Sequence, residues 1–490
     1  MNLLIDPWIP VLHQGRFQHV TLKDVLCQDA DWQLCSFRDD MELAALQLVI
    51  CLVQVIFPPD SHKEVRQRLA TPMDEEEFSL RVSKYLDMFV LDHPKHPFMQ
   101  TRGVKAKEST PMQKLFIGYD RSFFNDPDEI SRACPACVAV ALFNQASNCP
   151  SFGGGFKGSL RGSAPLTTLV YGESLRSTIW RNILSRNTGD QQSMSSLDGN
   201  NQPGWVDQIK SQEVIYPHKI GLLRGLFWQP AHVEVEWQNS KSQCQACNQV
   251  THKLAIGFKK EKFKYEIQGI WLHPHSPREW KLAKGTREEK YASFTTTAPA
   301  WTQLNTFLTE REIGSAKAGQ PAKAGYVPSA VVSQFRKVFF GEEINLIVGG
   351  YRVNQASVLQ RRHEMFNLPA GWTENMDKVE ELIALGLKVK DELRKKLFGF
   401  AKKVHVPGLP SQAEERFYQS SEPLIHKTLR TMKWQEGERI KADLLEQLSS
   451  LARQIFEEVT QSYRHDPKMI RAFALSRRSL NSALNKLSIS

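Results

Sequence analysis

Two pairs of cysteines have the spacing of metal ligands. They are Cys134-Pro-Ala-Cys137 and Cys244-Gln-Ala-Cys247. Two such pairs can supply the four thiolates of a tetrahedral zinc site, and four protein ligands leave no open position for catalysis. The interval between the pairs far exceeds the about 15–20 residues of a compact zinc ribbon. The pattern therefore predicts a structural Zn²⁺ that joins two distant loops, with redox pairs or unligated thiols as the alternatives.

A glycine-rich run, Gly153-Gly-Gly-Phe-Lys-Gly158, matches the GxGxxG pattern of nucleotide-binding loops. Such loops need a strand before the glycines and a helix N-terminus after them. Here a helical pattern precedes the glycines, and the strand-like run Leu166–Val170 follows them. The run therefore indicates either a tight turn or a close approach of the backbone to another molecule.

Few other residues suggest an active site. Asp39, Asp40 and Glu42 could hold a metal ion, but acidic residues are also favoured at a helix N-terminus. His273 and His275 lie among prolines, which is typical of a structural turn. The sequence has no HExxH, nucleophile-elbow or Walker A motif. These observations favour a binding or scaffold protein over an enzyme.

Composition is that of a globular protein with a basic surplus. The 490 residues are 41% hydrophobic and 24% charged, which excludes wholesale disorder, and the net charge of +10 favours a polyanionic partner. The most apolar segment, Leu43–Phe57, is shorter than the about 20 residues of a membrane span, so it predicts a buried helix. The first residues lack the pattern of a signal peptide. We therefore expect a cytoplasmic protein with reduced thiols and no membrane partner.

The hydrophobic pattern predicts an α+β protein with two domains. Residues 1–370 mix strand-like runs and helices without the regular alternation of a doubly wound sheet, which predicts a large mixed α/β domain. Residues 371–490 carry amphipathic segments joined by short loops, which predicts a four-helix bundle. The expected strands of the first domain are Thr167–Tyr171, His232–Trp237, Phe263–Leu272 and Ile344–Val348, and its expected helices are Met41–Phe57, Glu76–Phe89 and Cys137–Gln145.

Local signals add detail to the bundle. Ser411-x-x-Glu414 predicts a capping box at the start of the second helix, and Pro423 predicts a kink or a break within it. Basic residues crowd the first helix, which indicates either a solvated face or a track for a nucleic-acid backbone. They are Lys388, Lys390, Arg394, Lys395 and Lys396.

Several longer strings together resemble the CasA family, the large subunit of Cascade, which is the type I-E CRISPR surveillance complex. They are Met1–Asp6, Arg38–Leu46, His96–Thr101, Ala141–Gln145, Phe152–Lys157, Arg224–His232 and Gly349–Arg352. The resemblance covers essentially the whole chain and is weaker in the bundle. It implies a non-catalytic subunit that recognises a short protospacer-adjacent motif (PAM) in double-stranded DNA, starts R-loop formation, and helps recruit a helicase-nuclease for antiviral defence.

The resemblance also implies which residues read the PAM. The glycine loop, which consists of Phe152, Gly153, Gly154 and Gly155, is similar to the PAM-contacting loop of the family. Lys262 matches a lysine that reaches into the minor groove, where a cation suits the acceptor atoms. Ser151 stands where relatives can have a further glycine, so the preferred PAM can differ. The neighbouring Lys259, Lys260 and Lys264 are expected to contact phosphates or solvent.

A second matching segment is Asn354-Gln355-Ala356, which is similar to the wedge of the family. The resemblance implies that Asn354 and Gln355 open the first base pair beyond the PAM, and that Ala356 lies against the PAM itself. Gly349 and Gly350 predict the hairpin turn that would present this segment. An ordinary hairpin with a polar tip is the alternative.

A third matching segment is Phe123-Phe124-Asn125, just before Cys134. It is similar to the loop by which the family docks onto the crRNA 5′ handle and the neighbouring Cascade subunits. An aromatic ring can stack on an unpaired base while an amide reads a base edge. The implied partners of the whole chain are therefore the other Cascade subunits, crRNA, target DNA with its displaced strand, and the helicase-nuclease. A zinc-associated nuclease that uses Asp39, Asp40 and Glu42, or an assembly scaffold that never reads the PAM, is the alternative.

Overall fold

The computed structural model describes residues 1–117, 129–186, 201–313, 323–355 and 357–487. Its helices are α1 (Leu22–Cys27), α2 (Asp39–Ile56), α3 (His62–Ala70), α4 (Glu75–Val82), α5 (Gln113–Ile117), α6 (Pro135–Ser147), α7 (Leu175–Arg181), α8 (Leu222–Leu226), α9 (Leu304–Leu308), α10 (Ala330–Val338), α11 (Met376–Val404), α12 (Leu409–Arg430), α13 (Gly437–Thr460) and α14 (Ile470–Leu487). Its strands are β1 (Ile9–His13), β2 (Arg16–Val20), β3 (Gln33–Leu34), β4 (Thr110–Pro111), β5 (Thr167–Tyr171), β6 (Glu213–Ile215), β7 (His232–Gln243), β8 (Val250–Glu261), β9 (Tyr265–Ile267), β10 (Arg278–Ala283), β11 (Thr286–Tyr291), β12 (Arg311–Ile313), β13 (Ala324–Val327), β14 (Ile344–Asn354) and β15 (Ser357–Leu368).

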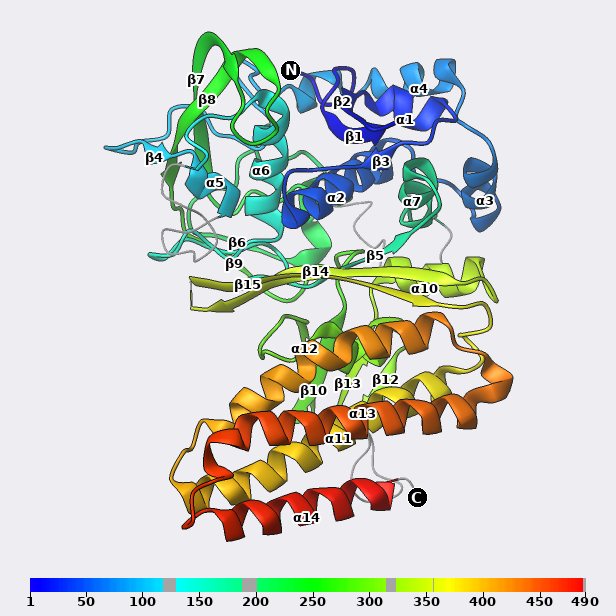
Figure 1. The fold of residues 1–490 in the computed structure, drawn as a ribbon. Coiled ribbons are helices and arrows are strands. Elements are labelled where there is room, and N and C mark those ends of the chain that lie inside the picture. The colour runs from blue at the N-terminus through cyan, green and yellow to red at the C-terminus, as the bar shows by residue number, and fades with distance from the viewer. Residues whose placement is uncertain (118–128, 187–200, 314–322, 356, 488–490) are drawn as a thin grey trace. The chain divides into compact units, whose positions relative to one another are not determined.

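The chain divides into two compact units (Figure 1). The first contains residues 1–295, 309–338 and 347–364, and the second contains residues 296–308, 339–346 and 365–490. The first unit mixes small sheets with helices, and the second ends in a helical region, so the expected mixed α/β architecture with C-terminal helices is confirmed.

Helix α2 lies at the centre of the core of the first unit. Its apolar residues are buried on every face, and it packs against α6, which is equally buried. The buried amide of Gln54 exchanges two hydrogen bonds with the backbone of Leu184, so this polar group costs little. The prediction of a buried helix over Leu43–Phe57 is confirmed, and no helix in the described ranges is long and apolar enough to cross a membrane.

Several small sheets surround these helices, and two of them carry the segments singled out in the sequence. One has the strand order β4-β8-β7, in which β7 and β8 form a long antiparallel hairpin, and another has the order β15-β14-β5. Of the expected strands, Phe263–Leu272 is largely wrong, because only Tyr265–Ile267 within it pairs as a strand. After β8 the chain bends, and β9 pairs in parallel with β6. Sequence periodicity cannot predict this bend or the pairing.

In the second unit, α11 packs against α12, α13 and α14, and α12 packs against α13 (Figure 1). Each of these helices buries one apolar face, as expected of amphipathic segments; on α11 this face includes Val389, Leu393 and Leu397. Gly386 lets α11 approach Trp301 closely, because an added Cβ would lie 2.9 Å from the indole ring. This contact ties the preceding segment 296–308 to the helices within the same unit.

One local prediction for the second helix is wrong, and another is tested only in part. The helix α12 begins at Leu409, with Gly408 as its N-cap, so Ser411 lies inside the first turn and forms no capping box. Pro410 at the start of the helix explains this earlier beginning, since proline is favoured at the first helical positions. Pro423 lies inside α12, which continues to Arg430, so no break occurs there, and the kink stays a prediction.

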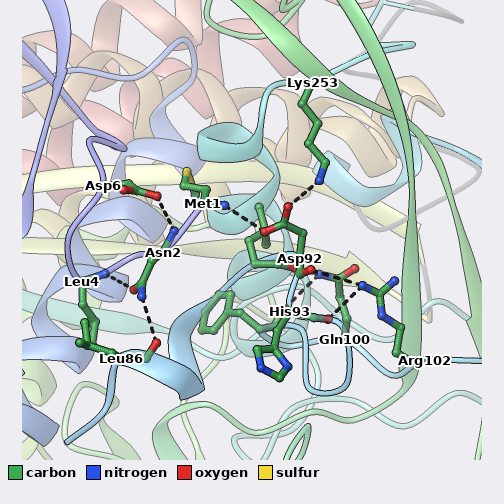
Figure 2. A network of polar contacts seen from close by, with 12 residues as sticks. Met1, Asn2, Leu4, Asp6, Leu86, Asp92, His93, Gln100, Arg102 and Lys253 are labelled. Atoms are coloured by element: carbon green, nitrogen blue, oxygen red, sulfur yellow. Dashed lines mark hydrogen bonds and ion pairs between the residues drawn. The ribbon is translucent and has the colours of Figure 1, made fainter. Parts of the chain in front are cut away.

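An ionic network attaches the β7–β8 hairpin to the start of the chain (Figure 2). The Asp92 carboxylate accepts from the ammonium of Met1 at 2.9 Å and from Lys253 on β8, and Figure 2 shows it between these two groups. The Gln100 side chain donates to Leu91 O at 2.7 Å and accepts from the backbone of Val235 on β7 at 3.0 Å. Both strands of the hairpin are therefore fixed to the segment 91–100.

The pKa of Asp92 makes this anchor dependent on pH. Burial alone would raise that pKa, but hydrogen bonds from Lys253 and the N-terminal ammonium outweigh burial and lower the pKa to about 2. A carboxyl whose pKa is depressed on folding stabilises the protein above its unfolded pKa of about 3.9, and this contribution is lost as the pH falls toward about 2.

We expect Asp92→Asn to lower the free energy of unfolding at pH 7 by about 1–2 kcal/mol, allowing for partial exposure of the pair. The difference between variant and wild type should shrink below about pH 4, because the wild-type carboxyl is then also losing its advantage. Urea titration at pH 7 and pH 3 measures both effects. The exposed Asp87→Asn is the control and should change little; a pH-independent loss in Asp92→Asn would contradict the ionic anchor.

Candidate nucleic-acid interface and metal centre

The glycine loop lies between the end of α6 and the start of β5, as the sequence indicated. Gly153, Gly154 and Gly155 have φ angles of 73°, 55° and 86°, in the left-handed region that side chains rarely adopt. A hydrogen bond of 3.0 Å from Phe156 N to Gly153 O closes the turn. Gly154 and Gly155 are exposed, so the loop presents bare backbone to solvent.

Lys262 meets this loop, although the two segments are far apart in the sequence. It directly follows β8, is exposed, and donates from Nζ to the carbonyl oxygen of Gly154 at 2.8 Å. A Cβ at Gly155 would lie 3.4 Å from the same Nζ. The structure therefore brings together a side-chain-free backbone edge and an ammonium group, two features that were predicted separately.

The four cysteines also come together. Their sulfur atoms all lie within 4.8 Å of one another, and those of Cys134 and Cys247 are 3.6 Å apart. Zinc–sulfur bonds of about 2.3 Å in a tetrahedron require sulfur–sulfur distances of about 3.8 Å. Cys134 and Cys137 lie at the N-terminus of α6, whereas Cys244 and Cys247 lie in the turn between β7 and β8. The donor set and its spacing fit one tetrahedral, thiophilic metal ion.

The pKa values of the cysteine thiols are shifted in opposite directions. Hydrogen bonds from Cys134 and Cys137 lower the pKa of the Cys244 thiol well below its ordinary value. Hydrogen bonding to Cys134, Cys244 and Cys247, together with burial, raises the pKa of Cys137. The cluster thus already favours a thiolate at Cys244, and a thiolate is the form that binds metal.

The wedge residues lie on a separate hairpin, at the turn between β14 and β15. Asn354 ends β14 and is exposed, and Gln355 follows with a left-handed φ of 54°. The expected turn at Gly349 and Gly350 is wrong, because both lie within β14. Gly349 instead allows a close approach of Leu43, since an added Cβ would lie 2.2 Å from the leucine methyl group.

Two predicted sites fall wholly or partly outside the described residues. The docking segment Phe123-Phe124-Asn125 lies in the gap 118–128, and Ala356 is likewise not described. The chain resumes at Glu129, and the Gln245 side chain accepts from the backbone of Ser131 at 2.6 Å and of Arg132 at 3.1 Å. The metal cluster and the end of this gap are therefore joined directly.

The chain matches a known protein family over most of its length. The family model described as "CRISPR-associated protein Cse1" matches residues 2–455. The chain belongs to the Cse1 family. A curated relative, the "CRISPR-associated protein CasA/Cse1" of Thermus thermophilus, is 25% identical over 199 residues, which are 37% of this chain and 39% of that protein. The predicted CasA resemblance is confirmed.

Solved structures share the Cse1 fold along nearly the full length. The crystal structure of Thermobifida fusca Cse1 is similar with a TM-score of 0.74 and 16% identity, over 99% of this chain and 98% of that one. A chain of a "CRISPR RNA-guided surveillance complex" is similar with a TM-score of 0.64 and 14% identity, over 98% and 99% of the two chains.

In this Cse1-family chain, the acidic residues Asp39, Asp40 and Glu42 are engaged by arginine side chains and hydrogen-bond donors of the protein itself. Asp40 is nearly buried and pairs with Arg38 through two hydrogen bonds of 2.6 and 2.8 Å, and it accepts from Tyr351 at 2.7 Å. Arg361 lies 3.3 Å from Asp39, and Glu42 accepts from the backbone of Ser36. Asp39 and Asp40 thus join the β14–β15 sheet to α2 through Arg361 and Tyr351, whereas Glu42 is bonded to the segment before α2.

The basic residues of α11 are partly neutralised. Lys390 pairs with Asp391 and Glu414, and Arg394 pairs with the same Glu414 at 3.1 Å. Lys388 and Lys395 are exposed. The face is therefore less positive than the count of lysines and arginines suggests, which favours the solvated-face interpretation for part of it.

Arg161, which was not predicted from the sequence, anchors the base of the glycine loop. The guanidinium is only 3% exposed and donates to neutral oxygens; burial lowers its pKa to about 10. Its acceptors are Ser147 O, Asn148 Oδ1, Thr167 Oγ1 and Ser276 Oγ. The first two end α6 and the third begins β5, so Arg161 joins both ends of the segment that carries the glycines. The only signal in the sequence was an arginine among small residues.

We expect the purified chain to hold about one equivalent of tetrahedral divalent metal, because the four sulfurs match the required spacing. Cys137→Ser should lose most of this metal and lower the melting temperature by several degrees, since the ion joins α6 to the β7–β8 turn. Elemental analysis and thermal melting measure the two effects. The matched control is Cys149→Ser, a buried thiol outside the cluster; equal metal content in both variants would contradict the site.

Proposed function

We propose that this chain is the large subunit of a type I-E CRISPR RNA-guided surveillance complex and that it recognises the PAM of double-stranded DNA from the minor groove. Family membership and the likeness to a chain of a surveillance complex support the assignment to such a complex. The observation that carries DNA reading is the hydrogen bond of 2.8 Å between Lys262 and Gly154, which joins a cation to an exposed glycine edge.

This edge suits the minor groove for two physical reasons. The groove is about 6 Å wide, so a backbone without side chains or a slender lysine can enter it where bulkier groups cannot. Its floor presents acceptor atoms on every base pair, and these attract an ammonium group and backbone N–H groups. Readout there separates A·T from G·C pairs more than individual bases, so the proposed recognition covers a short and degenerate motif.

Strand separation is assigned to the β14–β15 turn. Asn354 and Gln355 are polar groups at the tip of a hairpin that the acidic cluster and Arg361 fix to α2. Unstacking a base step costs a few kcal/mol, and a rigid support lets a short side chain act against that cost. Amide groups can also replace part of the hydrogen bonding that the opened base pair loses.

The remaining roles concern partners. We assign docking on the crRNA 5′ handle and the other Cascade subunits to Phe123, Phe124 and Asn125. The 371–490 domain would guide the displaced strand and face the helicase-nuclease that the complex recruits. The subunit itself is non-catalytic in this proposal, because Asp39 and Asp40 are engaged by Arg361 and Tyr351 of the wedge hairpin and Glu42 accepts from the backbone of Ser36.

Zinc is the metal that we assign to the four-cysteine cluster. Tetrahedral sites of four thiolates are typical of structural zinc, and a filled coordination sphere supplies stability rather than reactivity. The ion would brace the turn of the β7–β8 hairpin and the segment that leads from the docking loop into α6.

The proposal predicts that Lys262→Ala weakens binding of the guide-loaded complex to duplexes with a permissive PAM by about tenfold, the loss of one specific base-edge contact. Duplexes with a scrambled PAM should be affected much less. Gel shifts at fixed salt concentrations measure both, with a permissive PAM taken from a randomised library. Lys264→Ala, an exposed lysine nearby, is the control. An equal loss on both duplexes would favour a basic scaffold that does not read the PAM.

For the wedge we predict that Gln355→Gly slows R-loop formation on intact duplex by about tenfold and spares a target opened in advance, because only the former requires unstacking. Glycine retains the left-handed φ of this position, so the variant removes the amide group without straining the turn. Stopped-flow measurement with a fluorescent base analogue follows the opening. A comparable slowing of R-loop formation on the opened target would refute the wedge role.

A further inference from the structure

The β8 strand presents a row of residues to the glycine loop. Successive side chains of a strand alternate between its two faces, so Phe258 and Lys260 share one face and Lys259 lies on the other. Phe258 is fully buried and packs on the Phe152 ring with a centroid distance of 5.8 Å. Lys262, one residue beyond the strand, reaches the same loop through Gly154.

Lys260 lies over the two aromatic rings that flank the glycines. Its Nζ is 4.6 Å from the centroid of Phe152 and 5.6 Å from that of Phe156. The two rings contact each other edge to face at 5.6 Å. Both distances to the ammonium fall within the about 6 Å over which a cation is attracted to a ring face. The three side chains therefore form a clamp around Gly153, Gly154 and Gly155.

Such a clamp answers a specific physical problem. Three consecutive glycines have more backbone freedom than any other tripeptide, and binding must remove that freedom. Fixing the residues on either side removes part of it before DNA arrives. The sequence indicated a phosphate contact or a solvated lysine at position 260, but the ammonium is directed toward the protein's own aromatic rings.

We propose that Lys260 is a positioning residue for PAM reading: it holds Phe152 and Phe156 together and so fixes the edge of the glycine loop that enters the groove. The inference rests on the proposed function, because it assigns a purpose to the same loop. It differs from a phosphate contact, which would strengthen binding to every sequence and would add about one to the salt dependence of binding.

The first test measures the loop in the free full-length chain by hydrogen exchange. Lys260→Met keeps an apolar stem of similar length and removes the charge. We expect exchange of the hydrogen-bonded amides of Gly153 and Phe156 to become about two- to fivefold faster, the range given by an exposed cation–π contact. Lys260→Arg should retain slow exchange, since a guanidinium also stacks on aromatic rings. Lys259→Met, on the opposite face and near Glu236, is the matched control and should leave exchange unchanged.

The second test uses the guide-loaded complex on permissive and scrambled PAM duplexes across a salt series. Lys260→Met should lower the ratio of the two affinities by about two- to fivefold with an unchanged salt slope, and Lys260→Arg should restore the ratio. If binding to both duplexes is weakened equally and the salt slope of binding is reduced by about one, Lys260 is a phosphate contact and the inference is overturned. If the wild-type complex discriminates between the two duplexes and Lys260→Met discriminates equally well, the inference is also overturned.

The two readouts separate failure of the inference from failure of the proposed function. If the wild-type complex itself shows no preference for any PAM, the proposed function is wrong, whatever Lys260 does. Hydrogen exchange then still decides whether Lys260 holds the loop, because that measurement contains no DNA. Unchanged exchange in Lys260→Met refutes the clamp even if PAM discrimination is normal in the wild type.

Discussion

Antiparallel pairing of β7 with β8 determines the geometry of both candidate sites. The turn of this hairpin holds Cys244 and Cys247, and its other end delivers Lys260 and Lys262 to the glycine loop. A slip of one residue in the register would move Lys260 and Phe258 to the opposite face and exchange them for Lys259. The metal cluster at one end and the aromatic contacts at the other therefore depend on the same ladder of hydrogen bonds.

Contacts outside the hairpin protect that register. Asp92 holds Lys253 near the start of β8, Gln100 holds the backbone of β7, and the cysteine cluster ties the turn to α6. The same α6 ends at the residues that Arg161 binds, and Arg161 closes the base of the glycine loop. The loop is thus supported from the hairpin on one side and from the core on the other, which suits a backbone edge that must keep one shape.

The β14–β15 hairpin, which we propose as the wedge, is held in place by a different kind of contact. Its support comes from charged groups, with Asp39, Asp40 and Arg361 joining it to α2. A nearly buried ion pair such as Arg38–Asp40 adds little net stability, but loss of one partner would leave a costly unpaired charge. Asp39 and Asp40, which could have belonged to an acidic metal site, thus fix the hairpin to α2. Their geometry gives no support to the alternative of a nuclease.

Much of this was available in the sequence because it depends on local pattern. Periodicity identified the core helix α2 and the amphipathic helices of residues 371–490, and the two CxxC pairs named the four cysteines that the fold gathers into one cluster. Longer strings indicated the family. Ser411 and Gly349 show the limit: each fitted a local rule for a cap or a turn, yet packing around Pro410 and Leu43 placed the helix start and the strand elsewhere.

Tertiary structure alone decided which distant residues meet. Strand β8 was not among the strands expected from the sequence, so only the fold showed that Lys260 and Phe258 share a face and that this face lies against Phe152 and Phe156. Likewise, nothing in the sequence near Arg161 indicated that its guanidinium would be buried among neutral oxygens. Contacts between segments about a hundred residues apart depend on the sum of many weak packing terms, and no local propensity records that sum.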